Sequence, residues 1–272
     1  MSKINSLIAE RMSLIKPSPT MAVTKLAAEM KAAGKDVIGL GAGEPDFDTP
    51  DHIKNAAITA IKNGETKYTA VDGTPALKKA IVNKFYKDNN IEYKIDEIIV
   101  SVGGKQVLFN ALMSSINPGD EVIIPAPYWV SYPDMVALAG GIPIIVEGKE
   151  SNNFKVIPDD IKNKISDKTK WIIINSPSNP TGSSYTKNEL KDLGNLLLNY
   201  ENIFIMSDDI YEKIIYDDFK FYSLAEVVPA LKNRILTVNG VSKAYAMTGW
   251  RIGYAGGPKE LISSMAKLQS QS

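Results

Sequence analysis

Two residues near the end of the chain have side chains suited to hold a phosphorylated aldehyde. Lys243 follows a strand-like stretch at residues 234–238, and Arg251 lies eight positions further along. A lysine buried at the end of a strand can lose its proton and become a nucleophilic amine. A guanidinium can bind a phosphate through two parallel hydrogen bonds. This pair therefore favours a cofactor that is bound covalently through an aldehyde and ionically through a phosphate.

The composition excludes several other kinds of chemistry. Lys plus Arg equals Asp plus Glu at 31 each, so the net charge of zero gives no drive toward nucleic acid or anionic membranes. Cysteine is absent and His52 is the single histidine, which leaves no thiol nucleophile and no metal site of Cys or His ligands. Residues 1–16 carry charges throughout, and no apolar run reaches the roughly 18 residues that span a bilayer. We therefore predict a cytoplasmic protein without nucleic-acid or membrane partners.

The order of the secondary-structure patterns predicts an α/β protein. From residue 97 onward, continuous apolar runs rich in β-formers alternate with helical patterns, and this order favours a three-layer α/β/α fold with a mostly parallel sheet. The predicted strands are 98–102, 122–125, 142–146, 171–175, 203–207 and 235–238, and the predicted helices are 106–116, 132–139, 158–165 and 187–200.

The first part of the chain differs from this alternation. Residues 14–40 predict an arm, a helix at 22–33 and one strand. We therefore divide the chain into an N-terminal arm with part of a smaller domain (residues 1–48) and a large cofactor-binding domain (residues 49–272).

Polar loops follow five of the predicted strands. In open α/β sheets, ligands bind outside the carboxyl ends of the strands. Five loops at one edge are a more specific signal than any single motif, and they predict a ligand site there. The loops are residues 103–105, 125–129, 175–182, 207–211 and 242–243.

These loops carry sequences that resemble those of the class I, fold-type I pyridoxal-phosphate aminotransferases, and most of all the bacterial aspartate aminotransferases. The similar runs occur in the order of that family and cover almost the whole chain. They are GAGEPDFDTP (41–50), TKYT (66–69), GGKQ (103–106), PYWVSYP (127–133), NSPSNPTG (175–182), SDDIY (207–211) and SKAYAMTGWRIG (242–253).

The resemblance assigns roles around the ring of the cofactor, pyridoxal 5'-phosphate (PLP). Lys243 bonds to the cofactor aldehyde and later moves the proton from the substrate α-carbon. Asp208 keeps the pyridine nitrogen protonated, so that the ring withdraws electrons. Tyr211 and Asn179 donate to the phenolic oxygen, and Trp129 stacks on the ring.

The resemblance also implies a phosphate site that two subunits share. Gly103 and Gly104 would offer free N–H groups at a helix start, together with the Arg251 guanidinium and the Ser242 hydroxyl. Tyr68 would reach the phosphate in a neighbouring subunit, which implies a homodimer with two shared sites. Asp209, where many relatives carry glutamate, is expected to be a supporting or solvated group.

A dicarboxylic substrate needs a cation for its distal carboxylate. Lys105, which also borders the cofactor, would supply this cation with help from the hydroxyls of Ser18 and Thr20. The plainer alternative is a solvated lysine and two residues that cap a helix. Gly43 would let the backbone approach the substrate α-carboxylate. The substrate-binding set implied is Gly43, Trp129, Asn179, Lys105, Ser18 and Thr20.

The implied reaction is transamination of aspartate with 2-oxoglutarate to oxaloacetate and glutamate, with prephenate as a further amino acceptor. The family binds the α-carboxylate with an arginine near the end of its chain, whereas the three arginines here are Arg11, Arg234 and Arg251. We therefore expect that roughly the last third of the family sequence, with the rest of the small domain, is absent from this chain. We also expect such a chain to bind PLP but to transaminate poorly.

Three alternatives remain open. The chain could be another fold-type I aminotransferase or lyase, or a truncated form that binds PLP for a non-catalytic role. A nucleotide-binding α/β domain is disfavoured, because no Gly-x-Gly-x-x-Gly or Walker motif stands at a strand–helix junction.

Overall fold

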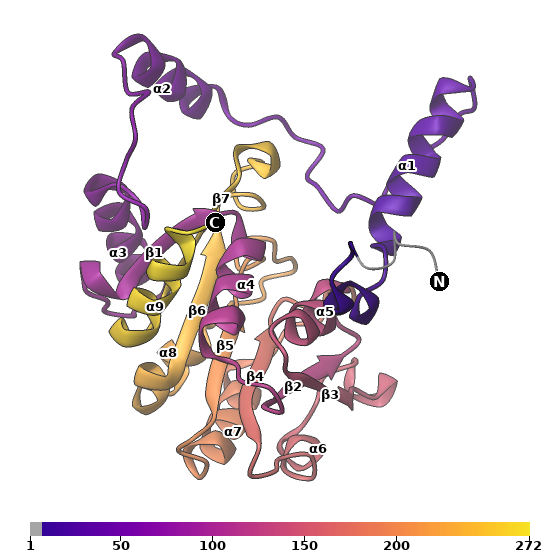
Figure 1. Ribbon diagram of the computed structural model, residues 1–272, viewed down its shortest axis with the longest axis vertical. Helices are drawn as coiled ribbons and strands as arrows, with labels where there is room; N and C mark the ends of the chain where they lie inside the picture. The colour runs from indigo at the N-terminus through magenta and orange to yellow at the C-terminus, as the bar shows by residue number, and fades with distance from the viewer. Residues whose placement is uncertain (1–6) are drawn as a thin grey trace.

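The computed structural model describes residues 7–272 and contains a seven-stranded sheet (Figure 1). The sheet order is β1-β7-β6-β5-β4-β2-β3. Only β7 runs against its neighbours; the other strands are parallel to one another, as predicted. The strands are β1 (Ile98–Val102), β2 (Glu121–Ala126), β3 (Ile142–Glu147), β4 (Thr169–Asn175), β5 (Phe204–Asp208), β6 (Ile235–Gly240) and β7 (Ile252–Gly256).

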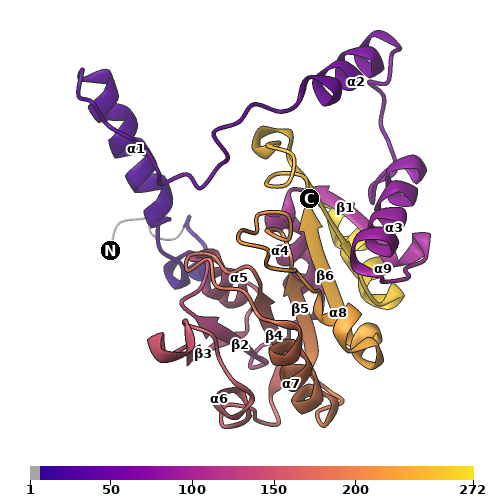
Figure 2. The ribbon, with the colours of Figure 1, turned by 180° about the vertical axis from the view of Figure 1, so that it is seen from behind.

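Helices cover both faces of the sheet, so that two hydrophobic cores form. Along β4, Trp171 and Ile173 point into one core while Ile172 and Ile174 point into the other, because successive side chains of a strand alternate between faces. One core packs against α4 (Gly104–Ser115), α5 (Ser131–Leu138) and α9 (Lys259–Gln269). The other packs against α3 (Pro75–Asn89), α6 (Pro158–Lys162), α7 (Lys187–Leu198) and α8 (Leu224–Val227). The expected three-layer architecture is confirmed (Figures 1 and 2).

Local sequence signals explain where several helices begin. Thr186 and Glu189 form a reciprocal capping box at α7, and Thr74 accepts from the backbone of Leu77 at the start of α3. The short 3-10 helices are η2 (Glu10–Leu14), η3 (Ile95–Glu97), η4 (Glu150–Asn152), η5 (Pro229–Arg234) and η6 (Thr248–Trp250). Within residues 7–272, no helix combines the length and the apolar character needed to cross a membrane.

The N-terminal segment extends away from the sheet (Figures 1 and 2). Neither α1 (Pro19–Ala32) nor α2 (Asp51–Lys62) has a buried side chain. The strand predicted before residue 40 is wrong, because residues 35–40 have no regular structure and Leu40 is 86% exposed. A strand needs a neighbour to satisfy its backbone groups, and this segment lies alongside none of the seven strands. The division at residue 48 falls in this extended segment and stays a prediction.

Candidate active site

The carboxyl ends of β4, β5 and β6 bring the predicted residues to one edge of the sheet. Asn175 and Asp208 are register partners on β4 and β5, and Asp208 pairs in turn with Val238 on β6. The strand β6 then leads directly into the loop of Lys243. Because parallel strands end at the same edge, residues that lie far apart in the sequence converge here.

Asp208 is buried at the last position of β5 and accepts a hydrogen bond of 2.7 Å from the Tyr132 hydroxyl. Burial raises the pKa of Asp208 to about 6, although the bonds from Tyr132 and from the Ile210 backbone oppose that rise. Above that pH the buried carboxylate would be stabilised by a cation, and a protonated pyridine nitrogen would supply one.

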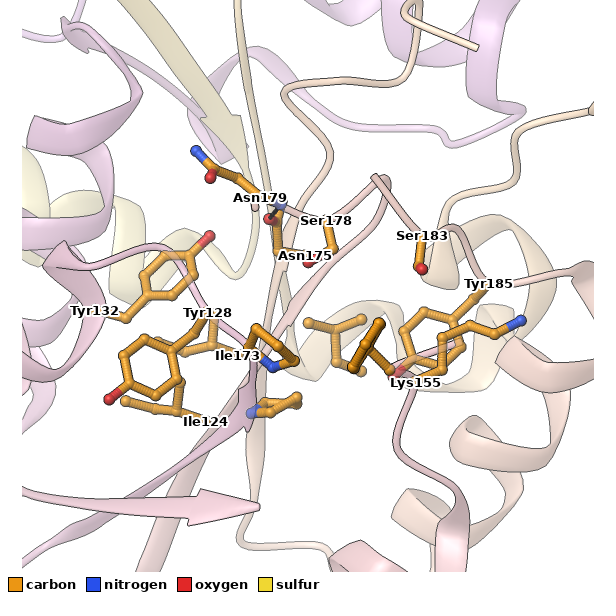
Figure 3. Close-up of a pocket in the computed structure, with 14 residues that line it drawn as sticks. Ile124, Tyr128, Tyr132, Lys155, Ile173, Asn175, Ser178, Asn179, Ser183 and Tyr185 are labelled. Carbon is orange, nitrogen blue, oxygen red and sulfur yellow. Dashed lines mark hydrogen bonds between the residues drawn. The ribbon is translucent and has the colours of Figure 1, made fainter. Parts of the chain in front are cut away.

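We did not predict the role of Tyr132. Its ring meets that of Trp129 edge to face, with 5.4 Å between the centroids. The sequence run that contains both aromatic residues gave no signal for the contact with Asp208, which is made across the sheet edge. Figure 3 shows the Tyr132 hydroxyl directed toward Asn179, whereas that of Tyr128 points the opposite way.

Lys243 lies in a half-buried position beside the N-terminal segment. Its Nζ donates to the carbonyl of Gly43 at 2.5 Å and lies 5.9 Å from the centroid of the Tyr211 ring. Burial lowers the pKa of Lys243; nearby Glu44 opposes that shift and Arg251 adds to it. A lowered pKa increases the fraction of neutral amine, which is the nucleophilic form.

Residues 43–49 are held over this lysine by contacts with the loop that follows it. The Thr248 hydroxyl donates to Glu44 at 2.9 Å, and the Trp250 indole donates to the Thr49 hydroxyl at 3.0 Å. These bonds explain how Gly43, from an otherwise extended segment, comes to contact Lys243.

The loop after β4 is ordered by two asparagines. Asn175 accepts from the backbone of Asn179 at 2.8 Å and donates to the carbonyl of Asp208 at 2.9 Å, so it supports the loop. The Asn179 amide donates to the Tyr211 hydroxyl at 3.2 Å. A small cavity beneath this loop is lined by Tyr128, Tyr132, Asn175 and Asn179, among others (Figure 3). The structure therefore places both predicted donors to a phenolic oxygen side by side.

An anion cradle forms where β1 turns into α4. Gly103 has φ +82°, and a Cβ at this position would overlap the Arg251 guanidinium. Only glycine allows this approach, and it places the guanidinium at a helix N-terminus, where free N–H groups point outward. Arg251 is fixed by donation to the carbonyl of Thr248 at 2.9 Å. The donors fit a phosphate group.

Two further residues were predicted at the cofactor, Ser242 and Lys105. Ser242 is buried directly before Lys243. The Lys105 ammonium lies 4.8 Å from the centroid of the Trp129 ring, a cation–π contact, and burial together with Arg251 lowers its pKa. Lys105 is therefore close to the predicted stacking face.

Other predicted residues are not joined to the site within one chain. Ser18 and Thr20 lie at the start of α1, and among residues 7–272 no hydrogen bond or ion pair links them to Lys105. Tyr68 is fully exposed between α2 and α3. Arg234 lies at the opposite edge of the sheet, where it donates to the carbonyls of Leu197, Tyr200 and Ile203.

Known proteins of one family match this chain. The family model described as aminotransferase class I and II matches residues 35–272. A probable aspartate/prephenate aminotransferase of Rickettsia typhi is 62% identical over 267 residues, which cover 98% of this chain and 67% of the relative. An aspartate/prephenate aminotransferase of Cereibacter sphaeroides is 57% identical over 267 residues, with the same coverage of both chains.

Solved structures give the same result. The aspartate aminotransferase of Rhizobium meliloti superposes with a TM-score of 0.94 at 54% identity, covering 97% of this chain and 66% of that one. The Thermus thermophilus aspartate aminotransferase with maleate gives 0.93 at 45% identity, covering 97% and 68%. The chain thus spans about two thirds of the length of these relatives.

Proposed function

The chain belongs to the class I and II aminotransferases, and we propose that its site serves transfer of the amino group of aspartate to 2-oxoglutarate, giving oxaloacetate and glutamate. One observation supports this most strongly: a half-buried lysine, a buried aspartate and a glycine–arginine anion cradle converge on one sheet edge. The names of the relatives add prephenate as a second amino acceptor.

The residues present fit PLP as the cofactor. When bound, PLP supplies an electron-withdrawing ring that stabilises negative charge on the substrate α-carbon. Arg251 and the backbone at Gly103 and Gly104 would hold its phosphate, with Ser242 beside them. Asp208 would face the ring nitrogen, and the hydroxyl of Tyr211 would face the phenolic oxygen.

Lys243 and Asp208 have different roles toward the two protons of the reaction, one on the substrate α-carbon and one on the ring nitrogen. Once the substrate amine has replaced Lys243 on the cofactor aldehyde, the Nζ of Lys243 would be free to accept a proton from the α-carbon, and its lowered pKa increases the fraction of neutral amine. Asp208, ionised above pH about 6, favours a proton on the nitrogen that it faces. The Tyr132 hydroxyl supports that ionised form, because its bond lowers the pKa of Asp208.

The choice of a dicarboxylic substrate would rest on Lys105. Its ammonium lies over the Trp129 ring and is available to a distal carboxylate on that side. Gly43 would approach the α-carboxylate from the segment held by Thr248 and Thr49. We keep Ser18 and Thr20 as further contacts in this proposal, together with Trp129 and Asn179.

A homodimer with shared sites is the assembly that we propose. Both N-terminal helices expose apolar side chains, including Met21 and Leu26 on α1 and Ile61 on α2, at 56–68% exposure. Neither helix buries a side chain, so these apolar side chains are available to a second copy of the chain. Tyr68 projects from the same part of the chain. We also propose that the N-terminal unit ends at residue 48 and that the protein is cytoplasmic.

A spectroscopic half-reaction tests the proposed function. We expect PLP to give a long-wavelength absorption band with the wild-type chain, and aspartate to convert that band faster than alanine or phenylalanine does. Lys243→Ala should abolish both the band and its conversion. Equal rates with alanine would favour another aminotransferase of this fold, and formation of a product without amino transfer would favour a lyase.

A further inference from the structure

Behind Asp208, on the opposite face of the sheet, lies a second buried carboxyl group. Asp209 directly follows β5 and is 2% exposed. The Ser207 hydroxyl donates to its Oδ1 at 2.7 Å, whereas its Oδ2 has no hydrogen-bond partner within residues 7–272. Since buried polar atoms are almost always paired, the unpartnered Oδ2 requires an explanation.

The nearest cation is already engaged. Lys84 of α3 forms an ion pair with Glu212, and it also donates to the Asn89 side chain at 2.7 Å. Asn89 in turn donates to the second oxygen of Glu212 at 2.9 Å. This cluster therefore contains two carboxyl groups and one ammonium, and the ammonium contacts Glu212. In the described part of the chain, Asp209 forms no ion pair.

The other groups that face Asp209 are neutral. The Tyr93 hydroxyl is bonded to Thr237 of β6 at 2.9 Å, and Tyr254 of β7 belongs to the same apolar core. Burial raises the pKa of both tyrosines, so neither is an anion at neutral pH. Ser223 is fully buried before α8, and its hydroxyl also lacks a hydrogen-bond partner among the described residues.

We propose that Asp209 is a neutral carboxylic acid at neutral pH, with its proton on Oδ2, the oxygen that has no hydrogen-bond partner among the described residues, and that it is the positioning residue for the strand end that carries Asp208. Protonation removes a buried charge that has no counter-ion in the described part of the chain. Burial also raises the pKa of Asp209 to about 8, against the opposing effects of Ser223 and Ser207.

The backbone of Asp209 explains how a side chain outside the site would act on it. Its N–H donates to the carbonyl of Val238 on β6 at 2.9 Å, and its carbonyl accepts from Glu212 at 3.0 Å. Asp209 thus joins the strand that leads to Lys243 with the turn that carries Tyr211. The positioning role rests on the proposed function, whereas the protonation is a property of the chain without cofactor.

Infrared difference spectroscopy tests the protonation directly. At pH 7 the wild-type chain should show the carbonyl stretching band of a protonated carboxylic acid, and Asp209→Asn should lack it. Glu212→Gln and Asp208→Asn should both keep the band, because Glu212 is paired with Lys84 and Asp208 is mostly ionised at that pH. A band that persists in Asp209→Asn, or its absence from the wild type, would overturn the proposal.

The pH dependence of unfolding provides a second test without cofactor. Because the pKa of Asp209 is about 8 when folded and 3.8 in its ordinary state, the folded chain retains a proton that the unfolded chain releases between these values. The stability of the wild type should therefore fall as pH rises from 5 to 8, by about tenfold in the unfolding constant per pH unit relative to Asp209→Asn. Parallel curves for the two chains would contradict a protonated Asp209.

The pH dependence of PLP affinity tests the positioning role of Asp209. PLP affinity of the wild type should decline above pH 8, where Asp209 ionises, and Asp209→Asn should not show this decline. Identical pH profiles for the two chains would overturn the positioning role. If the chain bound no PLP at any pH, the proposed function would fail, while the infrared and unfolding results would still decide the protonation.

Discussion

At the scale of single residues, the hydrogen bond between Tyr132 and Asp208 is the contact most open to test. Tyr132→Phe removes a bond that lowers the pKa of Asp208, so we expect that pKa to rise above about 6. The carboxylate would then be lost at a higher pH, and PLP affinity should fall about tenfold near pH 6, equivalent to ~1.4 kcal/mol. The measurement is PLP affinity against pH, followed by absorbance.

Tyr128→Phe is the matched control for this variant. Tyr128 lines the same cavity, but its hydroxyl points away from Asn179 (Figure 3). We expect its pH profile to match the wild type. If both variants shifted the profile alike, the effect would come from cavity polarity rather than from the bond to Asp208.

Several residues could be predicted from the sequence and others could not, for physical reasons. Lys243 and Asp208 stand in motifs at the carboxyl ends of parallel strands, so their convergence followed from the parallel sheet. Arg251 instead lies directly before β7 and reaches the same edge because that strand runs antiparallel to β6. Tyr132 acts through a contact made across the sheet edge, which the motif alone does not show. The unpartnered oxygen of Asp209 depends on packing against α3 and α8, and no local pattern reports it.

At the scale of elements, the junction between β1 and α4 tests the anion cradle. Gly103→Ala places a Cβ at φ +82° and against the Arg251 guanidinium, so we expect a loss of PLP affinity of tenfold or more. Gly104→Ala is the matched variant, because its Cβ would meet no atom within 4 Å and alanine favours the helix. Affinity for PLP and for inorganic phosphate should both be measured; an equal loss in the two variants would contradict the cradle.

Among the elements, the strands with continuous apolar runs were predicted best from the sequence. The six parallel strands matched their predicted ranges closely, because strands buried on both faces are continuously apolar. We missed β7, whose five residues include two glycines; Gly253 has no room for a side chain beside Gly103. We also missed α3, although Thr74 before Pro75 is a recognisable helix start.

At the scale of the whole molecule, the exposed N-terminal helices and Tyr68 predict sites shared between two copies. Tyr68→Ala and Lys243→Ala chains should each bind PLP weakly or without a covalent bond. In a mixed dimer, one site would receive the intact Lys243 of one chain and the intact Tyr68 of the other. We therefore expect mixing to restore covalent PLP binding at wild-type affinity in one of the two sites.

The control is a mixture of either variant with itself at the same concentration, with the association state followed by sedimentation. If the mixed sample bound PLP as the average of its parents, Tyr68 would act within its own chain. That result would contradict the shared-site assembly while leaving the site within each chain intact.

The central claim is that the amine of Lys243 is the group that bonds to PLP, and borohydride reduction followed by peptide mapping tests it most directly. The chain is incubated with PLP, reduced and digested, and the modified peptide is identified by mass spectrometry. We predict a single stable adduct on Lys243, dependent on the Arg251–Gly103 cradle. An adduct on another lysine, or none with excess PLP, would contradict the account.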